Sequence, residues 1–128
     1  MAGDGLVTSN GTVFSTDFQK VTKLKDGRIV GVAGTAFNVR PFVDWLENGG
    51  DLPELEENFD AIVLYPDGSS FSYNEKGRCI PEPAPTAVGS GRELAIGAML
   101  AGASALKAVT LAAQRDIATG GEIVEVRI

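Results

Sequence analysis

The stretch KVTKLKDGRIVGVAGTA, residues 20–36, carries the clearest structural signal in this 128-residue chain. Polar and apolar side chains alternate over residues 20–24, which is the period-two pattern of a half-buried strand. Asp26 and Gly27 form a tight-turn sequence, and residues 28–34 are mostly apolar, as in a buried strand. The stretch therefore predicts an antiparallel β-hairpin.

Patterns on both sides of this hairpin predict a mixture of strands and helices. Upstream, a turn at residues 9–11 separates the two short β-prone runs 6–8 and 12–15. Downstream, apolar side chains recur at helical spacing over residues 35–48, and a glycine pair begins at Gly49. A second hairpin and a helix are therefore expected around the first.

The second half of the chain continues this alternation. Ser104 is placed to cap a helix, and the proline-rich residues 81–85 predict an exposed connector. Because antiparallel hairpins alternate with helices, we predict one α+β domain over residues 1–128. The expected elements are strands at 61–65, 70–73, 79–80, 86–89 and 123–128, and helices at 91–100 and 105–116.

The residue counts exclude several kinds of chemistry. The chain has no histidine and one cysteine, Cys79. Ser-His-Asp and Cys-His catalysis, histidine-ligated zinc, disulfide frameworks and CxxC redox motifs are therefore excluded within this chain. Proton transfer would have to use lysine, carboxylates, hydroxyls or a terminal amine.

The net charge of −6 is concentrated in one segment. Seven acidic and no basic residues lie between Asp44 and Asp60, so the rest of the chain is close to neutral. A solvated loop and helix end is the simpler interpretation of this segment, and docking of a basic partner is the alternative. Without a basic face, a nucleic-acid partner is not expected.

No membrane partner is expected either. The longest weakly polar stretch, residues 94–106, is too short to span a bilayer. The first four residues have neither the basic nor the apolar region of a signal peptide. With a single cysteine, the chain is expected to be cytoplasmic.

Five segments, in chain order, resemble the proteasome-type threonine peptidases of the Ntn-hydrolase superfamily, which include bacterial HslV and related phage-encoded subunits. Each motif is weak alone, but together they extend over nearly the whole chain. The 16-residue step from Asp4 to Lys20 is similar to that in HslV. The segments are AGDG (2–5), KVTKL (20–24), GVAGTA (31–36), AVGSG (87–91) and RDIATGG (115–121).

The resemblance implies a hydrolase mechanism that needs no histidine, cofactor or metal. In this family the hydroxyl of an N-terminal threonine attacks a peptide carbonyl, and its own amine is the base. By resemblance, Lys20 would lower the pKa of the nucleophile and Asp4 would orient Lys20. Gly34 would donate its N–H to the oxyanion.

Three further residues would surround the terminal amine. These are Ser90, in the AVGSG segment, and Asp116 and Thr119, in the RDIATGG segment. Together with Lys20 and Asp4 they complete the side chains that the resemblance places in a catalytic site.

The resemblance also implies an architecture and partners. The fold would be the four-layer αββα sandwich of antiparallel sheets, with its first strand truncated. The chain would form a homo-oligomer, a ring or a dimer, and its partners would be an ATPase unfoldase and a peptide substrate.

The nucleophile is absent from the printed sequence. In the family it begins a strand directly before the Ala-Gly-Asp segment, whereas Met1 stands there in this chain. Thr8, Thr12 and Thr16 are internal and have no free amine. The chain as written is therefore expected to be inactive, although the family is one of threonine endopeptidases.

Three explanations are compatible with this difference: a true start upstream of Met1, a natural non-catalytic relative, or a chain shortened deliberately. Retention of Lys20, Asp4 and Asp116 favours the upstream start, since an inactive site could lose them. The alternative function is a structural or assembly subunit, of phage origin, that keeps the Ntn fold.

Overall fold

The hairpin predicted over residues 20–34 is confirmed in the computed structural model, which describes residues 1–128. Strands β4 (Val21–Lys23) and β5 (Ile29–Gly34) pair antiparallel. At the turn, the N–H of Leu24 donates to the carbonyl of Arg28 over 2.7 Å. A carboxylate oxygen of Asp26 accepts from the N–H of Arg28, which closes the loop.

This hairpin begins a five-stranded antiparallel sheet in which each strand lies beside its neighbours in the chain. The order is β4-β5-β6-β7-β8. Strand β6 spans Phe59–Leu64, β7 spans Ser70–Asn74 and β8 spans Cys79–Pro81. Proline at the end of β8 is tolerated because β8 is an edge strand.

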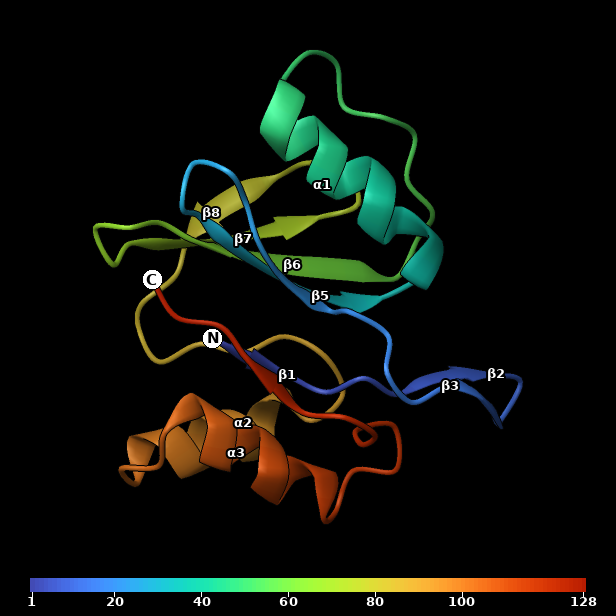
Figure 1. Cartoon of the computed structure of the whole chain (residues 1–128), viewed down its shortest axis with the longest axis vertical. Helices are drawn as coiled ribbons and strands as arrows, with labels where there is room; N and C mark the ends of the chain where they lie inside the picture. Colours follow the sequence, from blue (N-terminus) through green and yellow to red (C-terminus); the bar gives the residue numbers. More distant parts are fainter.

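Helix α1 (Val39–Asn48) covers one face of this sheet (Figure 1). A 3-10 turn, η1 (Ala36–Asn38), precedes it, and Gly49 ends it with a φ of +71°. The fully buried ring of Phe42 contacts three other aromatic rings there, at centroid distances of 5.1–5.8 Å. The buried cluster consists of Leu24, Val30, Val32, Phe42, Phe59, Ala61 and Val63.

The two chain ends meet beneath the opposite face of the sheet (Figure 1). Strand β1 (Ala2–Gly3) pairs antiparallel with β9 (Val124–Glu125). The Met1 amine donates to the carbonyl of Val126 over 2.7 Å, and the Val126 N–H donates to the carbonyl of Met1 over 2.8 Å. The Met1 sulfur occupies the space that a side chain at Gly31 would need.

Helices α2 (Arg92–Leu100) and α3 (Ala105–Ala113) pack together below this strand pair. Their buried residues are alanines, which allow close approach. As predicted, the Ser104 hydroxyl caps α3 by accepting from the N–H of Lys107. From top to bottom, Figure 1 shows α1, the five-stranded sheet, the β1–β9 pair, and the two helices in succession.

The predicted hairpin near the N-terminus is also confirmed. Strands β2 (Val7–Ser9) and β3 (Thr12–Ser15) pair antiparallel, and Asn10 and Gly11 form their turn with positive φ angles. This hairpin extends sideways from the rest of the chain (Figure 1).

Three predicted elements differ from the structure. Residues 86–89 form no strand. They follow Pro85 and end at Gly89, whose φ is +103°, and no strand pairs with them. The last strand is only the two residues that can pair with β1. Helix α3 ends at Ala113, because the chain turns there to direct Asp116 toward Ser90.

The acidic segment is a solvated helix end and loop, as the simpler interpretation predicted. All seven of its acidic residues are exposed. None of the helices combines the length and the apolar character that crossing a membrane requires.

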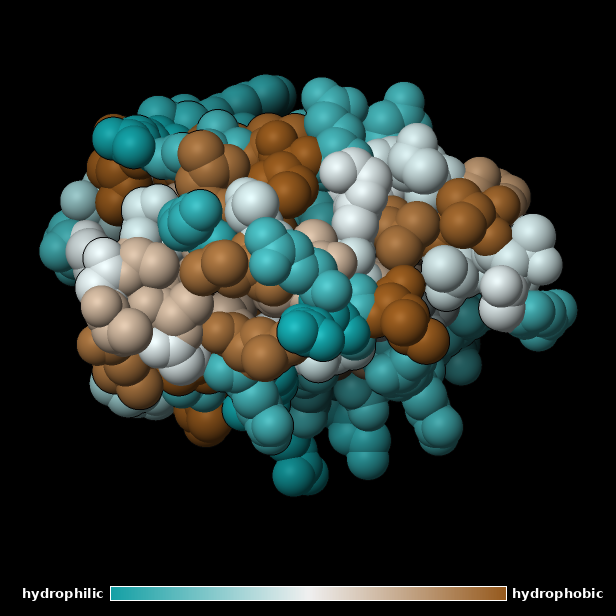
Figure 2. Space-filling view, turned by 90° about the horizontal axis from the view of Figure 1, so that it is seen from below, coloured by the Kyte–Doolittle hydropathy of each residue, from teal (hydrophilic) through white to brown (hydrophobic).

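Apolar side chains also reach the surface. Figure 2 shows brown side chains among polar ones on the face seen from below, where α2 and α3 lie. Leu94, Leu100 and Leu106 of these two helices are exposed.

A substitution pair tests the importance of the aromatic core. Phe42→Ala should lower the free energy of unfolding by about 3–5 kcal/mol, because it removes a fully buried ring and leaves a cavity. Phe37→Ala is the matched control, since the Phe37 side chain is 85% exposed, and it should change stability by less than about 0.5 kcal/mol. Urea unfolding measures both values, and equal losses would contradict the assignment of the core.

Candidate functional site

Lys20 and Asp4 form an ion pair between two segments. Lys20 directly precedes β4, and Asp4 directly follows β1. The Lys20 Nζ lies 2.9 Å from Oδ1 of Asp4, and the side chains are 19% and 13% exposed. An ion pair this sheltered is less screened by salt than one at the surface. The two residues that the sequence pattern singled out are therefore in contact.

Asp4 also binds two backbone N–H groups, which the sequence did not predict. Its Oδ2 accepts from the N–H of Gly120 over 2.9 Å and from the N–H of Leu6 over 3.3 Å. Gly120 is 116 residues away in the chain. The glycine pair after Thr119 was the available signal, because a backbone that approaches another segment closely often needs glycine.

Ser90, Asp116 and Thr119 form a second cluster. Both hydroxyls donate to Oδ2 of Asp116 over 2.5 Å. These hydrogen bonds hold the pKa of Asp116 below its ordinary value of 3.8, and the bond from Ser90 has the larger effect. The positive charge of Lys20 lowers the pKa further. The carboxylate is therefore stabilised in its ionised form.

Glycine at position 91 makes this second cluster sterically feasible. A Cβ at Gly91 would lie 2.9 Å from the Thr119 hydroxyl oxygen and 3.2 Å from the methyl carbon of Ala112. Gly91 is buried directly before α2, so any side chain there would displace Thr119 from Asp116.

Gly34 ends β5 in a conformation that favours glycine. Its φ is +98°, and a Cβ there would lie only 1.9 Å from the carbonyl oxygen of Asn58. The N–H of Val32 donates to the carbonyl of Lys20 over 2.9 Å. Because N–H groups two residues apart on a strand point to the same side, the Gly34 N–H is directed to the side of β5 on which Lys20 lies.

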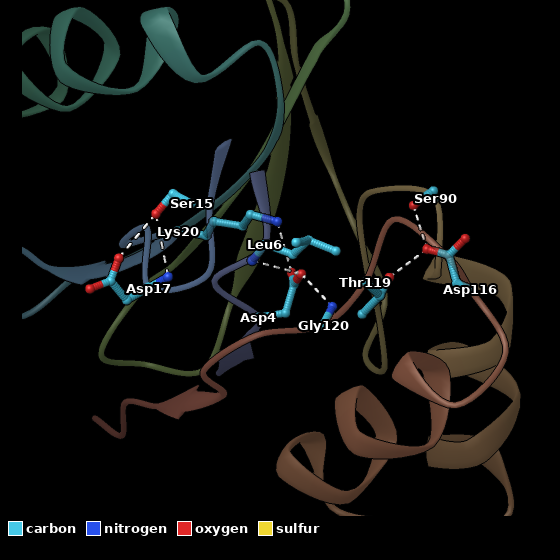
Figure 3. A network of polar contacts seen from close by, with 9 residues as sticks. All are labelled: Asp4, Leu6, Ser15, Asp17, Lys20, Ser90, Asp116, Thr119 and Gly120. Carbon is cyan, nitrogen blue, oxygen red and sulfur yellow. Dashed lines mark hydrogen bonds and ion pairs between the residues drawn. The ribbon is translucent and has the colours of Figure 1, made fainter. Parts of the chain in front are cut away.

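The two clusters meet at one peptide bond. Figure 3 shows Asp4 and Lys20 on one side and Ser90 and Asp116 on the other, with Thr119 and Gly120 between them. Thr119 hydrogen-bonds to Asp116, whereas its neighbour Gly120 hydrogen-bonds to Asp4.

The strand end at Gly34 lies close to this site. A Cβ at Gly89 would be 3.2 Å from the methyl carbon of Ala33. The structure therefore gathers all six predicted residues in one region, from five segments of the chain. No group of three or more histidine, cysteine, aspartate or glutamate side chains is placed to hold a metal ion.

Solved structures of similar shape are known. HslV from Trypanosoma brucei superposes with a TM-score of 0.78 and 22% identity over 96% of this chain and 88% of the other. Thiobacillus denitrificans BPH, a bacterial proteasome homologue, superposes with a TM-score of 0.75 and 19% identity over the same shares. The chain has the HslV-like proteasome fold.

A third similar structure is BPH from the same bacterium in complex with epoxomicin, with a TM-score of 0.73 and 21% identity. No protein-family model matches the sequence, and comparison with curated proteins finds no relative. At sequence identities of 19–22%, the similarity to HslV and BPH shows a shared fold. The roles of the six site residues stay predictions.

The pKa of Asp116 tests the second cluster. In the wild type its carboxyl should titrate below 3.8, and Ser90→Ala should raise the pKa toward that value, because the larger hydroxyl contribution is lost. Carbon-13 NMR of the carboxyl measures both values. Because folding lowers the pKa of Asp116, its ionised carboxylate stabilises the folded state at pH values above its pKa in the unfolded chain. This stabilisation is lost as the pH falls through the pKa of the folded state. An unchanged titration in the variant would contradict the contact.

Proposed function

We propose that residues 1–128 form a single proteasome-like Ntn-hydrolase domain, a subunit related to N-terminal threonine peptidases. The observation that carries this proposal is the sheltered Lys20–Asp4 ion pair, which lies beside the Ser90–Asp116–Thr119 cluster. The succession of helix, sheet, strand pair and helices supports the four-layer αββα sandwich with a truncated first strand.

Lys20 is the residue that would activate a nucleophile. A positive charge close to a hydroxyl or an amine favours the deprotonated form and lowers its pKa. Asp4 holds the ammonium group in place through an ion pair of 2.9 Å. In a region without histidine, such a lysine supplies the electrostatic effect that another enzyme would obtain from an imidazolium.

The remaining residues would serve the other charges of peptide hydrolysis. The Gly34 N–H would stabilise the oxyanion that forms on the attacked carbonyl. The Asp116 carboxylate, held by Ser90 and Thr119, would accept a hydrogen bond from the terminal amine of the nucleophile. That amine would act as the base that removes the hydroxyl proton.

The sequence as printed contains no terminal nucleophile, so we propose that this form does not hydrolyse peptides. Its Met1 amine donates a hydrogen bond to the carbonyl of Val126, next to the β1–β9 pair, and burial lowers the pKa of this amine. A threonine that begins a preceding strand would complete the site. The alternative function is a non-catalytic assembly subunit with the same fold, of phage origin.

The proposed partners follow from the same resemblance. They are further copies of the chain, in a ring or a dimer, a peptide substrate and an ATPase unfoldase, in a cytoplasmic setting. The exposed leucines on α2 and α3 support self-association, because apolar surface shared by neighbouring elements favours contact with another protein. Light scattering of the purified chain measures the assembly, and a strict monomer would contradict it.

Activity measurements test the proposed function. Protein that begins at Met1 should not cleave fluorogenic peptides. A form extended before Met1 by a strand that begins with a terminal threonine should cleave them. Lys20→Ala in that form should lower kcat by roughly 10²–10⁴-fold, because the charge beside the nucleophile is lost. Lys25→Ala is the control, since Lys25 is an exposed lysine in the β4–β5 turn.

Two further observations separate the peptidase from the assembly subunit. Native mass spectrometry of the natural protein identifies its first residue, and the coding DNA upstream of Met1 shows whether an in-frame Thr, Ser or Cys precedes it. Epoxomicin, which binds the Thiobacillus protein, should label the threonine form at its terminal residue. A stop codon directly upstream, with no labelling, would favour the assembly subunit.

A further inference from the structure

Three backbone segments cross at the carbonyl of Thr16, outside the six residues discussed above. The N–H of Glu122 donates to this carbonyl over 2.7 Å. A Cβ at Gly5 would lie 2.5 Å from its oxygen, and a Cβ at Gly121 would lie 2.3 Å from it. Both contacts are shorter than a side chain allows, so the crossing requires glycine on each side of Thr16.

Hydrogen bonds connect every pair of the three segments. The Gly5 N–H donates to the carbonyl of Gly120 over 3.1 Å, and the Phe18 N–H donates to the carbonyl of Gly5 over 3.0 Å. The Glu122–Thr16 bond joins the remaining pair. The Gly120 N–H adds a bond to the Asp4 carboxylate. The crossing is therefore a closed set of contacts, in which no segment can shift without breaking two bonds.

The crossing is joined along the chain to residues of both clusters of the site. Gly120 directly follows Thr119, whose hydroxyl binds Asp116. Phe18 lies two residues before Lys20, and Gly5 directly follows Asp4, the partner of Lys20. Any movement of the 120–122 backbone would therefore change the separation between the ion pair and the Asp116 cluster.

We propose that Gly120 and Gly121 are positioning residues of the candidate site, whose backbone holds the Ser90–Asp116–Thr119 cluster at a fixed distance from Lys20. The catalytic importance of this role rests on the proposed function. The coupling between the 120–122 backbone and the Ser90–Asp116–Thr119 cluster, however, can be measured without peptide hydrolysis. Gly120 acts through its N–H on Asp4. Gly121 acts through the close approach to Thr16 that its missing side chain permits.

The sequence contains a matched control for Gly121. Gly121 has a φ of +70° and a close backbone neighbour, whereas Gly11 has a φ of +77° and no atom within 4 Å of a Cβ position. Alanine introduces similar backbone strain at both positions. Only at position 121 does it also separate two segments, so a difference between the two variants reports the crossing.

Amide hydrogen exchange and carbon-13 NMR of the full chain test the proposal. Gly121→Ala should raise the exchange rates of the Gly120 and Glu122 amides at least tenfold, and should shift the carboxyl resonance of Asp116, because Thr119 moves. Gly11→Ala should leave both measurements as in the wild type. A folded Gly121→Ala protein with wild-type exchange and an unshifted Asp116 resonance would overturn the proposal.

Substitutions of Asp4 keep the proposal testable if Gly121→Ala does not fold. Asp4→Asn retains an oxygen that can accept from Gly120 but removes the charge beside Lys20, so it should keep the Gly120 amide protected. Asp4→Ala removes the acceptor and should lose that protection and shift the Asp116 resonance. Equal behaviour of the two variants would overturn the coupling. None of these outcomes depends on whether the chain is a peptidase.

Discussion

The carboxylate of Asp4 is the group on which the arrangement of the site depends. One of its oxygens binds the ammonium group of Lys20, and the other accepts from the backbone N–H groups of Gly120 and Leu6. Three segments, near residues 5, 20 and 120, are therefore held by one side chain. Hydrogen bonds to an ionised acceptor are stronger than neutral ones, which suits a residue that must hold backbone and side chain together.

Glycine has a steric function in the loops that surround the site. Gly91 leaves room for the Thr119 hydroxyl, Gly34 allows β5 to approach Asn58, and Gly121 allows the last loop to reach Thr16. At each position a Cβ would lie less than 3.0 Å from its neighbour. The Thr119–Asp116 and Glu122–Thr16 hydrogen bonds are thus formed where glycine leaves room for a close neighbour.

The two faces of the five-stranded sheet have different roles. On one face, aromatic rings around Phe42 pack α1 against the sheet and give the domain its main apolar core. On the other face the chain ends pair, and helices rich in alanine lie beyond them. Small side chains there provide less apolar area to bury, so hydrogen bonds and glycine contacts specify the position of the loops.

The sequence alone determined the elements whose signals are local. The alternating pattern of residues 20–24, the Asp26–Gly27 turn and the helical spacing before Gly49 each predict structure from neighbouring residues, and all three are confirmed. Six site residues were also predicted, through motifs similar to those of a known family. Three features could be seen only in the folded chain: residues 86–89 form no strand, the last strand is short, and Gly120 binds Asp4. The reason is physical: strand pairing and long-range hydrogen bonds depend on which segments meet in space, and a contact across 116 residues leaves no periodic signal in the chain.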